Sequence, residues 1–294
     1  MPSARLLPGD RLHLQHGPSD LIIWAEGGRD AAYLAAAKRF ETIIAEIVAE
    51  LPALREMLSP LTTKPEGQVA QRMHMACTPF ASTGYLTRMA AVAGSVADEV
   101  LSAICKHADI SRAYVNNGGD IALYLSQGTS LSTAIKGHGG TDLGRIEIDA
   151  SDQIGGIATS GRHGRSHSFG IAESVTVLAP SAAAADVAAT LIANEVDLPG
   201  HPAITRRAAC DLDDASDLGD LPVVTGCDPL SAAECIRALD VGKRRANDFQ
   251  RQGFINTAAL FLQGHVATSQ SYLLTPLKEP IHVQAKPAQN GLFG

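Results

Sequence analysis

The sequence predicts an α/β fold of the mixed α+β kind, in which long helices pack against a mostly antiparallel or mixed sheet. Apolar residues recur every three or four positions over residues 33–51, which is the spacing of one buried helix face. Short runs rich in β-branched residues alternate with Gly-rich turns over residues 113–148, as in strands joined by tight connections. Hydrophobic residues make up 45% of the 294 residues, which is enough for a substantial core. We predict one domain over residues 1–285 and a flexible C-terminal tail over residues 286–294.

The composition argues against a nucleic-acid or carbohydrate partner. Aromatic residues are only 4% of the chain and Trp24 is its single tryptophan, so few rings are available to stack on bases or sugars. The net charge is −7 and the chain shows no broad basic stripe, which disfavours general nucleic-acid binding. We therefore expect a small-molecule ligand.

The cysteines and the N-terminal segment predict a cytoplasmic protein with no membrane partner. The five cysteines are odd in number and form no C-x-x-C pair, which fits reduced thiols better than a disulfide framework or a zinc ribbon. Residues 1–20 carry charges but no apolar run of a secretion signal. The most apolar stretch, residues 89–104, is interrupted by Asp98 and Glu99. It is shorter than the ~20 residues of a membrane span, so we expect a buried helix there.

The first half of the chain begins with two strands separated by a Gly-Pro-Ser turn, and Pro52 ends the helix that follows them. The expected elements are strands at 11–15 and 21–25, helices at 33–51, 68–76 and 86–107, and a loop at 59–66. The last of these helices is rich in small residues, which permit close approach to a neighbouring element or to a ligand.

The second half begins with a β-rich block and ends with two helices. The expected elements are strands at 113–116, 121–125, 132–137, 145–148 and 174–179, helices at 182–196 and 228–252, and an acidic loop at 211–220. The alanine content of residues 182–196 favours the helical state. Because Ala-rich helices can pack within one subunit or between two, a homo-oligomer stays open.

The first candidate motif is Asn116-Asn117-Gly118-Gly119-Asp120. Two glycines between strand-like runs suit a primed hairpin turn, since both central positions need positive φ. That structural interpretation explains the motif by itself. The functional one places Asp120 at the mouth of a sheet, where its carboxylate accepts hydrogen bonds from a ligand.

The second motif is a Gly-rich basic stretch over residues 156–168. Its arginines can form bidentate contacts with phosphate, and the free N–H groups of a Gly-rich loop can bind an anion. The residues expected at a phosphate or pyrophosphate are Thr159, Ser160, Gly161, Arg162, His163 and Arg165. The alternative is a solvated polar loop. Zinc ligation by His163 and His167 would need a helix, which Gly161 and Gly164 disfavour.

The third motif is the pair Asp186 and Thr190, the only polar side chains in the apolar run 182–193. At positions i and i+4 they share one helix face. An unpaired carboxylate in an apolar helix is costly, so Asp186 needs a cation, an arginine or a solvated cleft. Carboxylate and hydroxyl oxygens suit Mg2+, which often bridges to phosphate. The alternative is that Asp186 faces solvent.

Taken in order, these motifs resemble the ApbE family, the FAD:protein FMN transferases. That family carries a G-G-D segment, a T-S-G loop and then A-D-x-x-x-T in a helix. The sequence is closer still to an uncharacterised sister family of ApbE-like proteins, whose pattern includes M-A-x-V-A-G, N-G-G-D-I, G-I-x-T-S, H-S-x-S-F-G and A-D-x-A-A-T. The corresponding segments of this chain are residues 89–94, 117–121, 156–160, 166–170 and 185–190.

The resemblance implies an ApbE-like fold with a site for Mg2+ and FAD. By this likeness Asp186 and Thr190 would ligate Mg2+. The FAD site would be lined by Asn117, Gly118, Gly119, Asp120 and residues 159–161. In the transferases the metal polarises the pyrophosphate, and FMN passes to a threonine of a target protein with release of AMP.

The chain departs from the transferase pattern after the T-S-G loop. Ser166-His167-Ser168-Phe169-Gly170 stands where the transferases carry His-Ile-Ile-Asp-Pro. His167 is the candidate catalytic acid or base, since its unperturbed pKa is about 6.5. Three functions therefore stay open. The first is a Mg2+-dependent enzyme acting on a flavin or nucleotide phosphate. The others are a non-catalytic flavin- or nucleotide-binding protein and a metabolic enzyme acting on another anionic small molecule.

Overall fold

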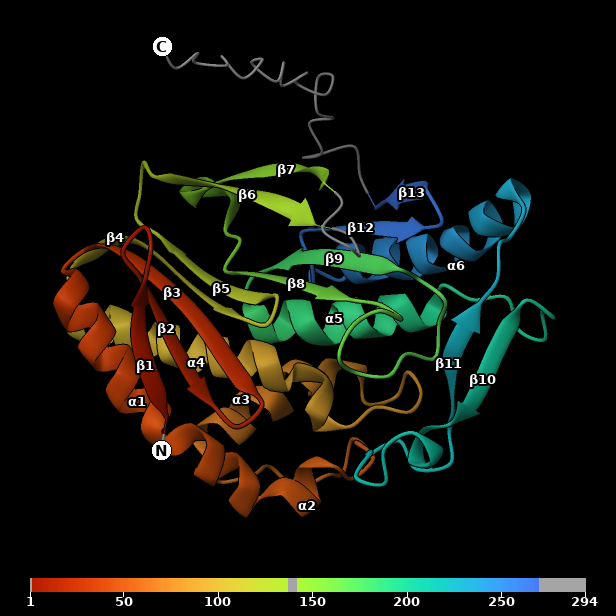
Figure 1. Cartoon of the computed structure of the whole chain (residues 1–294), viewed down its shortest axis with the longest axis horizontal. Coiled ribbons are helices and arrows are strands. Elements are labelled where there is room, and N and C mark those ends of the chain that lie inside the picture. The colour runs from red at the N-terminus through yellow and green to blue at the C-terminus, as the bar shows by residue number, and fades with distance from the viewer. Residues whose placement is uncertain (1, 137–141, 270–294) are drawn as a thin grey trace, which may run out of the picture.

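The computed structural model describes residues 2–136 and 142–269, and its central feature is a nine-stranded sheet (Figure 1). The strand order is β1-β2-β3-β4-β5-β8-β9-β12-β13, and each neighbouring pair is antiparallel. The predicted α/β fold, with an antiparallel sheet packed on long helices, is confirmed. The predicted tail at 286–294 and residues 270–285 of the predicted domain lie outside the described residues.

The elements follow one another along the chain with short connections. The strands of the main sheet are β1 (Ser3–Leu7), β2 (Arg11–His16), β3 (Ser19–Gly27), β4 (Ile110–Asn117), β5 (Asp120–Leu125), β8 (Gly156–Ser160), β9 (Ser174–Ala179), β12 (Thr257–Leu262) and β13 (His265–Thr268). Two further pairs are β6 (Ser130–Lys136) with β7 (Asp142–Asp149), and β10 (Ile204–Ala208) with β11 (Pro222–Cys227). The helices are α1 (Arg29–Ala49), α2 (Leu51–Leu54), α3 (Gln68–Cys77), α4 (Val92–His107), α5 (Ala182–Glu195) and α6 (Ala232–Arg251), with short 3-10 turns that include η1 (Thr78–Phe80) and η2 (Arg88–Ala91).

The sheet is covered on both faces, because strands buried on two sides need apolar partners on each. On one face, strands β2 to β5 pack against α1 and α4, which α3 contacts in turn, and strands β8, β9 and β12 pack against α5 and α6. On the other face, Ile146 and Ile148 of β7 pack on β5, β8 and β9. Figure 1 shows α4 and α5 below the sheet and the β6–β7 ribbon above it. Within the described residues, no helix is long and apolar enough to cross a membrane.

The middle of the sheet is held by a short pairing. The register of β5 with β8 covers two residue pairs, Ile121 with Ile157 and Ala122 with Gly156, and the Leu123 N–H also donates to the Gly155 carbonyl at 2.8 Å. The pairing of β4 with β5 runs over six residue pairs by contrast. The strand pairing at the β5–β8 line is therefore short, and apolar packing of Leu123 with Ile157 and Leu178 also joins its two sides.

The structure corrects two predicted boundaries. Residues 156–160 form strand β8, so Thr159 and Ser160, which were expected in a loop, lie at the end of a strand. The glycines there serve close packing: a Cβ atom at Gly156 would lie 2.1 Å from the Ala182 nitrogen. The helix predicted from residue 86 begins with the 3-10 turn η2, because the Thr87 side chain accepts a hydrogen bond from the Met89 N–H.

Several strands were not predicted from sequence. They are β1, β10, β11, β12 and β13. Strand β12 shows the reason: all six residues, Thr-Ala-Ala-Leu-Phe-Leu, are buried, so the apolar–polar alternation that signals a strand is absent. The other expected strands and helices are present with boundary shifts of a few residues.

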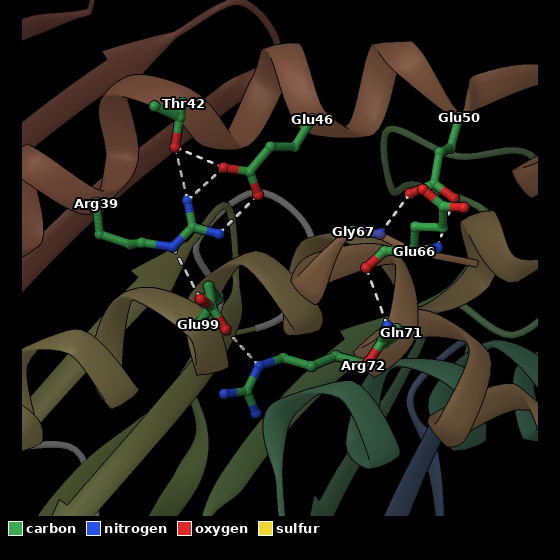
Figure 2. A network of polar contacts seen from close by, with 9 residues as sticks. All are labelled: Arg39, Thr42, Glu46, Glu50, Glu66, Gly67, Gln71, Arg72 and Glu99. Atoms are coloured by element: carbon green, nitrogen blue, oxygen red, sulfur yellow. Dashed lines mark hydrogen bonds and ion pairs between the residues drawn. The ribbon is translucent and has the colours of Figure 1, made fainter. Parts of the chain in front are cut away.

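A buried ion-pair network ties three helices together (Figure 2). Glu99 of α4 is almost fully buried and accepts hydrogen bonds from Arg39 Nε of α1 at 2.8 Å and Arg72 Nε of α3 at 2.7 Å. Arg39 also forms a bidentate pair with Glu46. Burial opposes ionisation of Glu99, but the two arginines outweigh it and hold its pKa below the usual value. The network therefore fixes α4, whose other end faces the candidate site.

Helices α4 and α5 cross with almost no space between their backbones. A Cβ atom at Gly94 would lie 2.3 Å from the Ala182 carbonyl oxygen. Only glycine fits at this position. The small-residue run was predicted to allow close approach to a neighbouring element, and that element is α5.

We predict that Gly94→Ala lowers the free energy of unfolding by about 2–3 kcal/mol, because the added methyl group must push the two backbones apart. Urea denaturation monitored by circular dichroism measures the change. Gly226→Ala is the control, because a Cβ atom there would make only ordinary contacts at 3.6 Å and beyond. Equal stability losses for the two variants would contradict the tight crossing.

Candidate functional site

Two carboxylates from distant parts of the chain interact electrostatically at the candidate site. Asp120 begins β5, and Asp186 lies in the second turn of α5. Burial raises the pKa of Asp186 well above its usual value, and the charge of Asp120 raises it further. Burial also raises the pKa of Asp120 to about 7, although the Thr159 N–H and the Arg165 charge lower it. The arrangement concentrates negative charge in a poorly solvated place.

Backbone N–H groups at the start of α4 hold Asp186. Its Oδ2 accepts a hydrogen bond from Gly94 at 3.0 Å, and its carboxylate also accepts one from the Ala93 N–H. These amides lie in the first helical turn, where N–H groups lack intrahelical partners and the helix dipole favours an anion. Sequence reasoning did not assign residues 93 and 94 to the site. Their signals were the small-residue run and the M-A-x-V-A-G segment, neither of which shows that a backbone N–H is the contact.

The Asn117–Asp120 hairpin positions Asp120. Gly118 and Gly119 have φ values of +66° and +117°, so the predicted primed turn is confirmed. Asn117 is 2% exposed, and its side chain donates to the Ala93 carbonyl at 3.1 Å and accepts from the Asp20 N–H at 3.3 Å. Asn117 therefore links the hairpin to the start of α4.

Arg165 is the predicted cation whose charge acts on Asp120. Its guanidinium lies against Gly118, where a Cβ atom would come within 2.1 Å of Nη2, and Nη1 donates to the Pro18 carbonyl at 3.2 Å. Its charge lowers the pKa of Asp120. Because the residue is exposed at this position, its remaining donors face water.

Strand β8 brings the second motif beside Asp120. The Thr159 N–H donates to the Asp120 carboxylate, and its hydroxyl is hydrogen-bonded to Thr176 at 2.9 Å. Ser160 pairs with Val175 at the end of the strand. Gly161 then turns the chain tightly, since a Cβ atom there would lie 2.5 Å from the Glu173 carbonyl oxygen.

The rest of the second motif turns toward other partners. Arg162 Nη2 is paired with Glu173 Oε1 at 3.3 Å, and the Arg162 N–H donates to Ala172. His163 is exposed and His167 is partly buried. The two residues after His167 are anchored to α5, because Ser168 Oγ and the Phe169 N–H both bind Asn194 Oδ1. The roles predicted for Arg162, His163 and His167 stay predictions.

The oxygen donors around Asp186 suit a hard cation. Thr190 follows one turn later on the same helix face and is partly exposed. Among the described residues, no group of three or more His, Cys, Asp or Glu side chains is placed to hold a metal. The available donors are two carboxylates, a hydroxyl and backbone oxygens, a set that fits Mg2+ better than zinc.

Cys77 is a neighbour of the site that sequence reasoning missed. Its thiol is fully buried and donates weakly to the Thr87 and Arg88 carbonyls. Burial raises its pKa, and the charge of Asp186 raises it further. The thiol is therefore protonated and contributes an apolar wall beside Asp186.

Comparison with known proteins agrees with the motif resemblance. A family model described as AbpE bacteria matches residues 3–268. A UPF0280 protein from Methanopyrus kandleri is 32% identical over 216 residues, which cover 69% of this chain and 80% of that protein. A UPF0280 protein from Methanococcus vannielii is 41% identical over 114 residues, covering 36% of this chain and 44% of that protein. The crystal structure of an ApbE protein from Thermotoga maritima aligns with a TM-score of 0.49 and 11% identity, covering 91% of this chain and 96% of that one.

We predict that Asp120→Asn stabilises the metal-free protein more at pH 8 than at pH 5, because pH 5 lies near the start of the range in which the acidic side chain costs stability. The pKa of Asp120 is raised to about 7 in the folded state, so the folded chain binds the extra proton. Its ionisation therefore costs stability as pH rises from about 4 through 7, and asparagine removes that cost, on the order of 1–2 kcal/mol after solvent screening.

Thermal unfolding in EDTA at both pH values measures the difference. Asp214→Asn, which alters an exposed carboxylate of the acidic loop, is the control and should show no such pH dependence. A loss of stability at pH 8 in Asp120→Asn would contradict the electrostatic account.

Proposed function

Because the chain belongs to the family described as AbpE bacteria, we propose that it binds a flavin nucleotide or a related phosphate ligand together with Mg2+, at the site formed by Asp120 and Asp186. The observation that supports this most is the convergence of two carboxylates whose pKa values are both raised. A bound divalent cation would offset their repulsion. Asp186, Asp120 and the Thr190 hydroxyl are the proposed metal ligands.

The residues around this pair suit the phosphate part of such a ligand. Arg165 lies at the Gly118 turn with its remaining guanidinium donors toward water, as a phosphate contact requires. When bound, Mg2+ would neutralise charge on a pyrophosphate group. The carboxylates alone would repel such a ligand, so metal and nucleotide should bind together.

The proposed reaction is transfer of a flavin phosphate group to a hydroxyl acceptor. The acceptor oxygen would form a bond to the flavin-side phosphorus, and the bond from that phosphorus to the bridging oxygen would break and release AMP. His167 is proposed to take the proton of the acceptor hydroxyl. A non-catalytic binding protein is the second candidate, because residues 168 and 169 are tied to Asn194 and Arg162 to Glu173.

We predict that Asp186→Asn weakens Mg2+-dependent FAD binding by at least about tenfold, since it removes a proposed metal ligand. Isothermal titration of FAD with and without Mg2+ measures binding, and chromatography of released AMP measures turnover. Asp214→Asn serves as the matched control. Binding without AMP release supports the non-catalytic candidate. Failure of the wild-type protein to bind FAD in the presence of Mg2+ contradicts the proposed function.

A second experiment compares the contributions of Arg162 and Arg165 of the Gly-rich segment to FAD affinity. Arg165→Ala is expected to weaken FAD binding by about 2 kcal/mol, roughly thirtyfold, because a charge-assisted hydrogen bond is lost. Arg162→Ala is expected to change affinity much less, since its guanidinium already holds Glu173. An equal loss of affinity in both variants would show that Arg162 leaves Glu173 to bind the ligand.

A further inference from the structure

Helices α4 and α5 cap each other through two aspartates. Asp186 of α5 accepts hydrogen bonds from the Ala93 and Gly94 N–H groups in the first turn of α4. Asp98 of α4 accepts hydrogen bonds in turn from Ala182 at 3.0 Å and Ala183 at 2.9 Å, in the first turn of α5. Each helix thus satisfies the unpaired N–H groups of the other.

The two bonds of Asp98 are distinct from the ordinary cap of α5. Ser181 is the local cap, and its Oγ accepts from the Ala184 N–H at 3.2 Å. Asp98 instead comes from another helix, 84 and 85 residues away from its partners. Loss of Ser181 would loosen the end of α5, whereas loss of Asp98 would also release α5 from α4.

The crossing point makes this link rigid. Gly94 lies directly against the Ala182 carbonyl, so a shift of the α5 N-terminus moves it against the first turn of α4. That turn carries the two N–H groups that hold the Asp186 carboxylate. The position of Asp186 therefore depends on a residue one turn further along α4.

We propose that Asp98 is a positioning residue for the candidate site, which sets the place of the Asp186 carboxylate by holding the N-terminus of α5 against α4. Within the described residues Asp98 forms no hydrogen bond with Asp120 or with the predicted ligand contacts, although its charge adds to the raised pKa of Asp186. It borders a separate hollow of about 330 Å³, lined also by Arg72, Phe80 and Phe254. Its effect on ligand binding rests on the proposed function, but its effect on Asp186 does not.

The substitution Asp98→Ala tests the link without weakening α4 itself, because alanine has the higher helix propensity. The hollow beside Asp98 admits water to the vacated place. The comparison variant is Ser181→Ala, which removes a cap from the same turn of α5 and leaves the connection between the helices intact. Asp98→Asn, which keeps one acceptor oxygen, serves if the alanine variant does not fold.

The metal-independent measurement is amide hydrogen exchange by NMR at Ala93 and Gly94. We expect exchange there to be about tenfold faster in Asp98→Ala, because the Asp186 carboxylate is no longer held against these amides. Ser181→Ala is expected to speed exchange at Ala184 only. Unchanged exchange at Gly94 in Asp98→Ala, or equal acceleration in both variants, overturns the proposal.

Ligand titration then shows whether the positioning matters for binding. Mg2+-dependent FAD binding is expected to weaken about tenfold in Asp98→Ala and to stay near the wild-type value in Ser181→Ala, the scale known for groups that support a metal ligand. Affinity equal to wild type in Asp98→Ala overturns the role at the site. If the wild-type protein itself binds neither Mg2+ nor FAD, the proposed function fails, and the exchange measurement still decides the link between Asp98 and Asp186.

Discussion

The site depends on two helices that cap each other, since each contributes an aspartate that accepts hydrogen bonds from the first turn of the other. Asp98 holds the first turn of α5, and Asp186 holds the first turn of α4. Both aspartates are placed where backbone N–H groups and the helix dipole compensate their charge, which lets them stay within an otherwise apolar packing layer. Since Gly94 brings the backbones into contact, neither helix can move alone.

This arrangement explains how like charges can share a small space. Asp186 is stabilised by α4 and Asp120 by the Thr159 N–H and Arg165, yet burial outweighs these contacts and both carboxylates remain poorly solvated. Burying two carboxylates together lowers the free energy of unfolding of the protein, and such a loss is common at functional sites. The hydrogen-bonded supports of the pair limit how far the carboxylates can move apart.

The side chains of the site could be predicted from sequence, but their partners could not. Asp186 stood out as a lone charge in an apolar helix, and Asp120 as the residue after a Gly-Gly turn. The role of the Gly94 amide could not be predicted from sequence, because every residue except proline has a backbone N–H group. Arg162 and Arg165 look alike in sequence, and only the path of the chain after β8 separates the one beside Glu173 from the one beside Gly118. Strand β8 was not predicted, and its last two residues were expected in a loop, because its glycine serves packing against Ala182 rather than a turn.

The short β5–β8 pairing has a mechanical consequence. Asp120 belongs to the half of the sheet that ends with β5, whereas Thr159 and Asp186 belong to the half that begins with β8. The two carboxylates therefore lie on either side of a strand pairing that few backbone hydrogen bonds span. A molecule bound by both carboxylates would add a further connection across this pairing, beside the α4–α5 crossing that already joins its two sides.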